Sequence, residues 1–329
     1  MYVTGKSLLD VRGNRRSHLS SAADLVDREF ESLDASVSIP HNASMPKTLV
    51  FLGGTGKLGQ EVAPGLATAD YDRKIALVRP GKNVEGFESI EVEDMKKVAS
   101  LREVLKDAHT IVSTLSGPDL CEIECAVIEA APHMQLFVPS QYGVDSARWE
   151  PGFPFLDAKR KVLEKAATVP TLVVAAGGFA DQLFFFLMDV SNGKVTLVDG
   201  GQALYSFTRR RDIGYALARI LSDPKYAKGG TVYLEGSTHT WKEATGLLEQ
   251  ATGRTFEYTD MTVAQAKEKE QEMLSNGLAG DMGQFYAAFG LHLLRAPADG
   301  STGINVSEGS YDGYEFETLE QTIADVWAK

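Results

Sequence analysis

The sequence predicts an α/β protein built on a doubly wound parallel sheet, with a smaller C-terminal substrate-binding lobe. Residues 48–52 form a continuous apolar, β-prone run that stops at the glycine-rich stretch 53–59, which is the pattern of a strand, a tight turn and a helix. Further short apolar runs then alternate with segments of helical spacing. Because these strands are apolar throughout, helices are expected to cover both faces of the sheet.

The elements of this sheet are expected in strict alternation. The predicted strands comprise residues 48–52, 75–78, 90–92, 110–113, 135–138 and 171–175. The predicted helices between them comprise residues 60–69, 95–105, 122–131 and 158–167. Apolar residues recur at intervals of three or four in these helices, so that one face of each can pack on the sheet.

The strict alternation ends after Phe179, and the chain beyond it is interpreted as a smaller lobe. Residues 45–190 are assigned to a Rossmann domain, and residues 191–329 mostly to a substrate-binding lobe, with 205–235 partly returning to the Rossmann domain. The predicted elements of this part are helices at 212–222, 241–252 and 263–275 and a strand at 231–234.

Residues 1–44 precede the first predicted strand and are expected to form a disordered leader. The first twenty residues carry four basic side chains, Lys6, Arg12, Arg15 and Arg16, against the single acid Asp10, a composition similar to that of an organellar transit peptide. Acidic residues accumulate after them, which favours the disordered leader. Both interpretations stay open.

Composition excludes several classes of function. The chain has 329 residues with 33 Lys and Arg against 45 Asp and Glu, so its formal net charge of −12 argues against a nucleic-acid-binding surface. The sequence has no apolar run of about 18 residues that could span a membrane. Cys121 and Cys125 have no histidine nearby, and their spacing predicts neither a zinc site nor a disulfide framework. A reducing, cytoplasmic setting without a metal site is therefore expected.

The glycine cluster is the strongest indication of a binding site. Gly53 permits a tight turn, Gly56 lets the backbone approach a pyrophosphate, and Gly59 lets the following helix pack closely on the strand. The free amides at the start of that helix would then bind the phosphates. A flexible turn is the alternative for a glycine triplet alone, but the preceding apolar strand favours a dinucleotide site.

The end of the second predicted strand indicates which dinucleotide binds. A site for NAD usually has an acidic residue there to hold the ribose hydroxyls. In this chain the strand ends in Leu77 and Val78 and is followed by Arg79 and Lys82, whose charges suit the 2′-phosphate of NADP(H). NADP(H) is therefore the expected cofactor, the alternative being that Arg79 is a solvated surface cation.

Five motifs, taken together, connect the chain to a known family. They are Gly-Gly-Thr-Gly-Lys-Leu-Gly at 53–59, Leu-Val-Arg at 77–79, Phe-Val-Pro-Ser-Gln-Tyr-Gly at 137–143, Phe-Leu-Asp-Ala-Lys at 155–159 and Gly-Phe at 178–179. The chain thus resembles the NmrA-like and isoflavone reductase-like family of atypical short-chain dehydrogenases, from about residue 45 to about residue 236. The resemblance implies a Rossmann domain that binds NADPH, and often a reductase of phenolic or phenylpropanoid-type substrates.

The expected cofactor site combines the glycine motif, the cations after the second strand and residues that follow later strands. It comprises Gly53, Thr55, Gly56, Lys57, Leu58, Gly59, Arg79, Lys82, Thr114, Ser140, Lys159 and Phe179. Thr114 is expected near the nicotinamide ribose, and Phe179 beside the nicotinamide. An ordinary core position is the alternative for Phe179.

The resemblance also implies a lysine that acts as general acid/base, early in the helix after the fifth strand. Lys159 matches that position, and Lys161 remains a rival because the spacing to Pro170 is shorter than expected. A lysine beside a cofactor and apolar walls would have a lowered pKa and could supply a proton near neutral pH. An ordinary basic helix face is the alternative.

Two further residues bear on the proton donor. Tyrosine-dependent dehydrogenases have a tyrosine four positions before the lysine, but this chain has Phe155 there, which has no proton to give. Tyr142, in the loop after the fifth strand, is a substitute donor because ligands bind at that edge of the sheet. Local packing of its ring is the alternative.

The leading hypothesis is an NADPH-dependent reductase of a small aromatic or polyketide-like molecule, with a lysine as general acid/base. Phe184, Phe185, Phe186, Phe285, Tyr286 and Phe289 are candidates to line its pocket. A non-catalytic, NADP(H)-sensing regulatory protein of the NmrA type is the alternative, since the fold cannot separate the two. An epimerase would also require the missing tyrosine. Expected partners are a small-molecule substrate and, as an open possibility, a second copy in a homodimer.

Overall fold

The computed structural model describes residues 46–182, 188–189, 192–276, 282–296, 304 and 311–327. The chain divides into two units, Met1–Met45 and Pro46–Lys329, and the architecture below is that of the second. The expected leader, residues 1–44, and the aromatic run 184–186 lie outside the described residues. The boundary expected at residue 190 stays a prediction.

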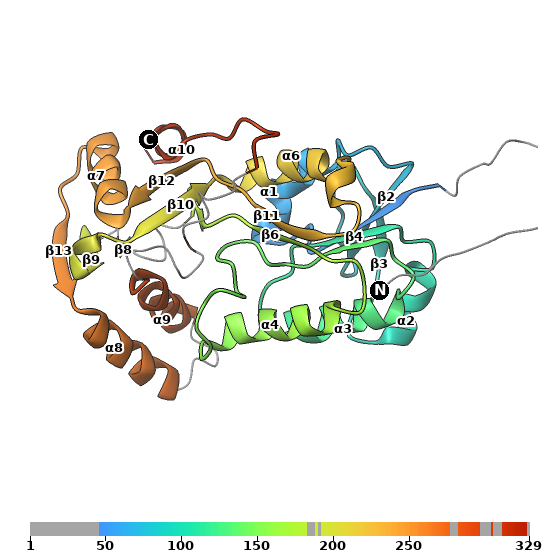
Figure 1. Ribbon diagram of the computed structural model, residues 1–329, viewed down its shortest axis with the longest axis horizontal. Coiled ribbons are helices and arrows are strands. Elements are labelled where there is room, and N and C mark those ends of the chain that lie inside the picture. The colour runs from blue at the N-terminus through green and yellow to red at the C-terminus, as the bar shows by residue number, and fades with distance from the viewer. Residues whose placement is uncertain are drawn as a thin grey trace, which may run out of the picture. The chain divides into compact units, whose positions relative to one another are not determined.

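A five-stranded parallel sheet forms the centre of the fold (Figure 1). Its strands are β1 (Thr48–Leu52), β2 (Arg73–Val78), β3 (Glu88–Glu91), β4 (Thr110–Ser113) and β5 (Leu136–Val138). Their spatial order is β3-β2-β1-β4-β5, so the direction of winding reverses between β1 and β4. A bridge from Phe137 to Thr171 leads on to β6 (Leu172–Ala175), which pairs in parallel with β11 (Gly230–Tyr233). This order confirms the predicted doubly wound fold.

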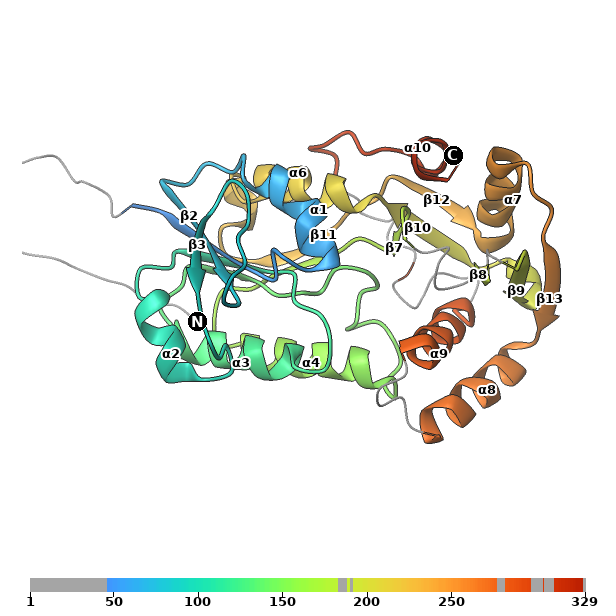
Figure 2. The ribbon, with the colours of Figure 1, turned by 180° about the vertical axis from the view of Figure 1, so that it is seen from behind.

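Helices cover both faces of this sheet (Figures 1 and 2). On one face lie α1 (Lys57–Leu66) and α6 (Arg210–Ile220), and on the other α2 (Val98–Val104), α3 (Leu120–Ala130) and α4 (Pro154–Ala166). Strand β1 is buried along its whole length: Leu49 and Phe51 pack into the core on the α1 face, and Val50 and Leu52 into the core on the α3 face. A side-chain period of two with both faces covered explains its continuous apolar sequence.

Within the residues that the structure describes, the remaining strands and α-helices form two smaller sheets and four helices. One sheet consists of β7 (Gly178–Phe179), β10 (Leu204–Thr208) and β12 (Ser237–Thr240), and the other of β8 (Met188–Asp189), β9 (Lys194–Val198) and β13 (Glu257–Met261). The helices are α7 (Trp241–Thr252), α8 (Val263–Ser275), α9 (Met282–Leu294) and α10 (Leu319–Val326). Trp241, Tyr205 and Phe153 lie in their common core, which therefore also includes the residue that precedes α4.

Two helices have the predicted bounds, and two others begin before the residue that apolar spacing predicts. Helices α7 and α8 begin and end at the predicted residues, and Thr240 and Thr262 form capping boxes at their N-termini. Helix α4 begins at Pro154 rather than at 158, because proline is well suited to a first helical turn. Helix α1 likewise begins at Lys57 rather than at 60, directly after the extended N-cap Gly56.

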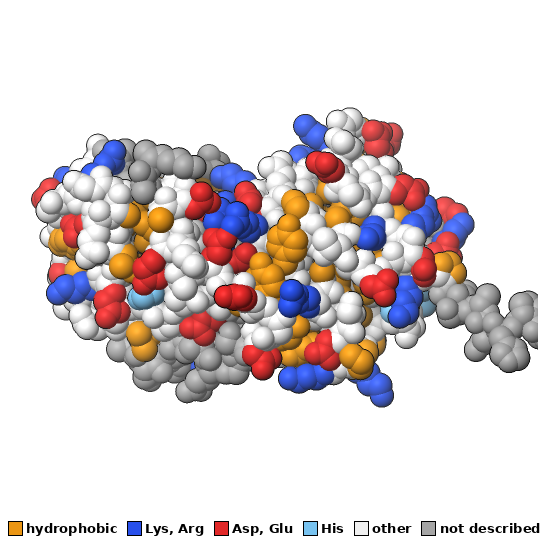
Figure 3. All heavy atoms as spheres, turned by 90° about the horizontal axis from the view of Figure 1, so that it is seen from above, with side chains coloured by type: hydrophobic (Ala, Val, Ile, Leu, Met, Phe, Trp, Pro, Cys, Tyr) orange, Lys and Arg blue, Asp and Glu red, His pale blue; other side chains and the backbone are white. Residues whose placement is uncertain are grey.

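Within the described residues, no helix combines the length and apolar content needed to cross a membrane. On the face drawn in Figure 3, acidic and basic side chains are interspersed rather than separated by sign.

Candidate functional site

The glycine turn lies between the end of β1 and the start of α1. Gly53 has φ +78°, a left-handed conformation that favours glycine, and its carbonyl accepts a 2.9 Å hydrogen bond from the Gly56 amide. A Cβ at Gly59 would collide with the Gly53 carbonyl oxygen, so only glycine lets α1 begin this close to the turn. The amides at the start of α1 are therefore held at the carboxyl end of β1.

The glycine turn also touches the segment that follows β4. A Cβ at Gly53 would lie only 2.8 Å from the backbone of Thr114 and Leu115. Thr114 is buried, and its hydroxyl donates a hydrogen bond of 3.1 Å to the carbonyl of Leu52, the last residue of β1. Because β1 and β4 are the strands between which the winding reverses, this contact lies at the topological switch point where such sheets bind ligands.

A cleft of about 660 Å³ opens beside the glycine turn, between α1 and the loop that follows β2. Its lining includes Gly54, Thr55, Gln60, Arg79, Lys82 and Asn83. Arg79 and Lys82, the two predicted cations, are both exposed, and Glu91 shapes their loop by accepting a 2.9 Å hydrogen bond from the Gly81 amide. The structure thus places both cations in a hollow next to the turn.

Gln60 and Asn83 also line this cleft, although no sequence motif singled them out. Both side chains are exposed amides, which can donate to and accept from a ligand. Of the other predicted cofactor residues, Lys57 is exposed at the first position of α1, and Leu58 and Phe179 are half-buried against the core on the α1 face.

Lys159 lies on α4 with only 4% of its surface exposed. Its Nζ donates a hydrogen bond of 3.1 Å to the Tyr142 carbonyl and lies 5.0 Å from the centre of the Phe155 ring. Burial lowers the pKa of Lys159 to about 8, although the nearby Glu124 charge acts in the opposite direction. Lys161, the rival, is exposed on the same helix. The two lysines therefore occupy different environments.

Tyr142 follows β5 and packs into the core on the α1 face. Its hydroxyl is buried without a hydrogen-bond partner among the described residues. Burial, followed by the Glu124 charge, raises the pKa of Tyr142 well above its usual value. The hydroxyl therefore keeps its proton over the ordinary pH range, and it can act as a neutral donor.

Glu124 is a buried carboxylic acid that apolar spacing alone did not reveal. It lies on α3 with an exposed fraction of 0%, on the same buried face as Leu120 and Val127. Its Oε1 accepts a 2.9 Å hydrogen bond from the amide of Ser140, a predicted cofactor residue. Burial raises the pKa of Glu124 to about 7, against the lowering effects of Ser113, Ser140 and Lys159. A glutamate within an otherwise apolar helical stripe was the available signal.

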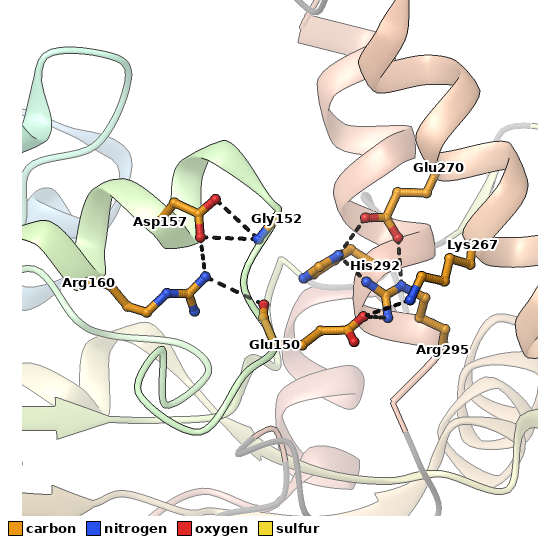
Figure 4. A network of polar contacts seen from close by, with 8 residues as sticks. All are labelled: Glu150, Gly152, Asp157, Arg160, Lys267, Glu270, His292 and Arg295. Atoms are coloured by element: carbon orange, nitrogen blue, oxygen red, sulfur yellow. Dashed lines mark hydrogen bonds and ion pairs between the residues drawn. The ribbon is translucent and has the colours of Figure 1, made fainter.

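A second buried polar network joins the loop before α4 to α8 and α9 (Figure 4). His292 Nδ1 and Arg295 Nε each lie 2.6 Å from a different carboxylate oxygen of Glu270. Arg295 also forms an ion pair with Glu150, whose carboxylate lies 3.8 Å from Lys267 Nζ. Although burial raises the pKa of Glu270, the bonds from His292 and Arg295 outweigh it and lower that pKa overall.

Metal ligation and cysteine chemistry find little support in the described part of the chain. No group of three or more His, Cys, Asp or Glu side chains is arranged there to hold a metal ion. Cys121 and Cys125 are both free and half-buried on α3, and burial raises the pKa of Cys125 to about 11. Its thiol is therefore not activated as a nucleophile.

Comparison with known proteins identifies the family. The model of the NmrA-like family matches residues 45–321, and the chain belongs to this family. The sequence is 26% identical over 237 residues to phenylcoumaran benzylic ether reductase Pyrc5 of Pyrus communis, covering 64% of this chain and 76% of that protein. It is 27% identical over 235 residues to an isoflavone reductase homolog of Solanum tuberosum, with the same two coverages. The predicted family is thus confirmed.

The fold is also that of a solved reductase. Leucoanthocyanidin reductase from Vitis vinifera, solved as its binary complex with NADPH, superposes with a TM-score of 0.69 at 20% sequence identity. The match covers 86% of this chain and all of that one. The family match extends well past residue 236, where the sequence motifs become weak.

Proposed function

We propose that the protein is an NADPH-dependent reductase of a small aromatic or polyketide-like molecule, with Lys159 as general acid/base. The observation that carries the proposal is the environment of Lys159: a buried amine with a pKa of about 8, next to the loop at the carboxyl end of β5. The names of the matched relatives, a reductase and a reductase homolog, support an activity of this class.

The glycine turn and the cleft beside it are the proposed site for NADPH. Backbone amides at the start of α1 are suited to the diphosphate, and Gly53 and Gly59 occupy positions where a Cβ would collide with backbone atoms. Arg79 and Lys82 are proposed to bind the 2′-phosphate through charge-assisted hydrogen bonds. The predicted Thr55, Lys57, Leu58, Thr114, Ser140 and Phe179 complete the proposed site.

NADPH, when bound, supplies a hydride, and the residues of the chain must supply the matching proton. With a pKa near 8, Lys159 is mostly protonated at neutral pH and gives up its proton without a large penalty. Phe155 has no proton to give and packs its ring beneath the amine. The buried Tyr142 hydroxyl is the proposed second donor.

Aromatic side chains beside Lys159 support an aromatic substrate. The Phe155 ring lies 6.1 Å from that of Phe285 and 5.9 Å from that of Phe289, both of which belong to α9. Phe285 and Phe289 are partly buried, so part of each ring surface stays open to solvent or a ligand. A wall of phenylalanine rings next to a proton donor is suited to a planar, mainly apolar molecule.

The decisive experiment follows NADPH absorbance with a panel of aromatic ketones, enones and aldehydes. Wild type is compared with Lys159→Met and with the matched control Lys161→Met, which changes an exposed lysine on the same helix. Turnover that is lost in Lys159→Met and kept in Lys161→Met supports the proposal. Tight NADPH binding without oxidation by any panel member contradicts it and favours the NADP(H)-sensing regulator.

The cofactor preference has its own test, isothermal calorimetry with NADPH and NADH. Arg79→Ala is expected to weaken NADPH binding by about 1.5–3 kcal/mol, or roughly 10- to 150-fold, and to leave NADH binding nearly unchanged. Arg73→Ala is the control, because Arg73 is an exposed cation at the opposite end of β2. Equal losses for both dinucleotides would refute the assignment of Arg79.

A further inference from the structure

We propose that Glu124 is the positioning residue of this site: its carboxylate fixes the loop after β5 and keeps the buried Lys159 ammonium charged, so that a proton is available at neutral pH. The inference rests on the proposed reductase function, and it assigns a role to a carboxylic acid that does not itself touch the reacting atoms.

Glu124 occupies a position where a carboxylate is costly for the fold. Its exposed fraction is 0%, and its neighbours on the buried face of α3 are apolar side chains such as Leu120 and Val127. One carboxylate oxygen accepts the Ser140 amide at 2.9 Å, and Oε2 has no hydrogen-bond partner among the residues described. The Ser113 side chain also lowers the pKa of Glu124 through a hydrogen bond. A fully buried carboxylate that keeps one oxygen without a partner is still a poor stabiliser, which favours a functional role.

Glu124 and Lys159 each form a hydrogen bond with the backbone of the loop after β5. The carboxylate of Glu124, on α3, accepts a hydrogen bond from the Ser140 amide. The ammonium of Lys159, on α4, donates a hydrogen bond of 3.1 Å to the carbonyl of Tyr142. A shift in either side chain therefore moves the loop that carries the other contact. Gln141 strengthens the link, since its side-chain amide donates to the Lys159 carbonyl at 3.0 Å.

The two charges also stabilise each other through space. Burial acts on them in opposite directions, raising the pKa of Glu124 to about 7 and lowering that of Lys159 to about 8, and each charge favours ionisation of the other. The other titratable groups that face the pair are Tyr142, whose proton stays on, and the Cys125 thiol, with its pKa of about 11. Near neutral pH, therefore, Glu124 and Lys159 titrate as a coupled pair.

When the Glu124 charge is removed, burial is the main influence left on the pKa of Lys159. The pKa of the amine then falls further below its usual range, and a smaller fraction of it carries a proton at neutral pH. In the direction that consumes NADPH, the alkaline limb of the kcat profile reports loss of this proton. Glu124→Gln is therefore expected to move that limb to lower pH by roughly one to two units.

The test uses the full chain, NADPH and a substrate from the panel, with kcat and KM measured across pH. Glu124→Gln should lower kcat at alkaline pH with little change in KM for NADPH, and Glu124→Asp, which keeps the charge, should restore part of the alkaline limb. Glu129→Gln is the matched control, since Glu129 is an exposed acid on the same helix. An unshifted limb in Glu124→Gln would overturn the proposal.

A readout without turnover separates this inference from the proposed reductase function. Lys159 is labelled with acetic anhydride at a series of pH values, and its reactivity is followed by peptide mass spectrometry. A lower midpoint in Glu124→Gln than in wild type and Glu129→Gln supports the coupling even if no panel member is reduced. Equal midpoints overturn it.

The wild type supplies a measurement that needs no folded variant. Carboxyl carbon NMR of glutamate-labelled protein should contain one signal that titrates near pH 7, well above the other glutamates. A wild-type Lys159 that titrates near the ordinary lysine value, or a spectrum without such a carboxyl signal, also overturns the proposal.

Discussion

Glu124 and Glu270 are both carboxylic acids removed from water, yet their surroundings differ in kind. Glu270 has a cationic or imidazole nitrogen 2.6 Å from each oxygen, supplied by Arg295 and His292. Glu124 accepts a backbone amide on one oxygen, and its other oxygen has no hydrogen-bond partner in the part of the chain that the structure describes. Its cation, Lys159, donates to the Tyr142 carbonyl instead. The pKa of Glu270 is lowered by its partners, whereas burial raises that of Glu124 to about 7.

The different surroundings of these two carboxylates suit them to different roles. A carboxylate in direct contact with its cation stays charged, and the contact joins α8, α9 and the loop before α4 (Figure 4). A buried carboxylate without such direct contact, as in Glu124, has a pKa close to neutral pH. Perturbed groups of the second kind are typical of functional sites. Substitution of Lys159 should therefore affect catalysis, whereas substitution of Arg295 should affect stability.

The largest effect is expected from the amine itself. Lys159→Met should reduce turnover by about 10²- to 10⁴-fold, because the proton donor is lost while the apolar stem is kept. Arg295→Met, the corresponding change in the Glu270 network, should leave kcat nearly unchanged and lower stability. Steady-state kinetics and urea unfolding of both variants check this separation, and a large loss of kcat in Arg295→Met would contradict it.

The next largest effect concerns the stability of the Glu270 network. Glu270→Gln should lower the free energy of unfolding by about 3 kcal/mol, because the largely buried guanidinium of Arg295 loses the charge that compensates it. Urea denaturation with a fluorescence readout measures the loss. A free energy of unfolding indistinguishable from that of wild type would mean that the Glu270 network does not stabilise the fold.

The pH dependence of stability should differ in sign between the two acids. A raised pKa, as in Glu124, gives a stabilising contribution that is complete below about pH 4.5 and is lost as the pH rises through about 7. A lowered pKa, as in Glu270, gives a contribution that is complete above about pH 4.5 and is lost as the pH falls further. Unfolding free energies are measured from pH 2 to 8 for wild type, Glu124→Gln and Glu270→Gln. The difference between wild type and Glu124→Gln should change between about pH 4.5 and 7, and that between wild type and Glu270→Gln only below about pH 4.5. Parallel curves would contradict this.

The smallest effect is expected at an exposed ion pair. Arg73 and Glu88 lie 2.7 Å apart on neighbouring strands, and about half of each side chain is open to solvent. Glu88→Gln should leave the unfolding midpoint unchanged within error, because water already screens the pair. A measurable loss of stability in Glu88→Gln would mean that an ion pair stabilises this protein without burial, and that burial is not needed to explain a loss of stability in Glu270→Gln.

Much of the cofactor side of the molecule was predictable because its signals are local. The strand, glycine turn and helix from Thr48 to Leu66 follow one another in sequence, and the position of Arg79 depends only on where β2 ends. Lys159 was found through a motif, and its burial agrees with the low pKa expected for it. Its role as proton donor stays a prediction.

Other features depend on contacts that are distant in sequence. Strand β13 was not predicted because Glu257–Asp260 are exposed and lack an apolar face; its partner β9 lies some sixty residues earlier. Helix α9 was not predicted, since its apolar residues are not confined to one stripe. The complete burial of Glu124 depends on the packing of α3 against α4, and its place in an apolar stripe was the one local signal of it.

The close contact between Gly59 and the Gly53 carbonyl has a consequence for the energetics of ligand capture. Because α1 is locked against the turn by backbone atoms alone, its first amides are already oriented before any anion arrives. A diphosphate bound at the proposed NADPH site would therefore lose little of its interaction energy to ordering the loop, and more of that energy would be retained as affinity.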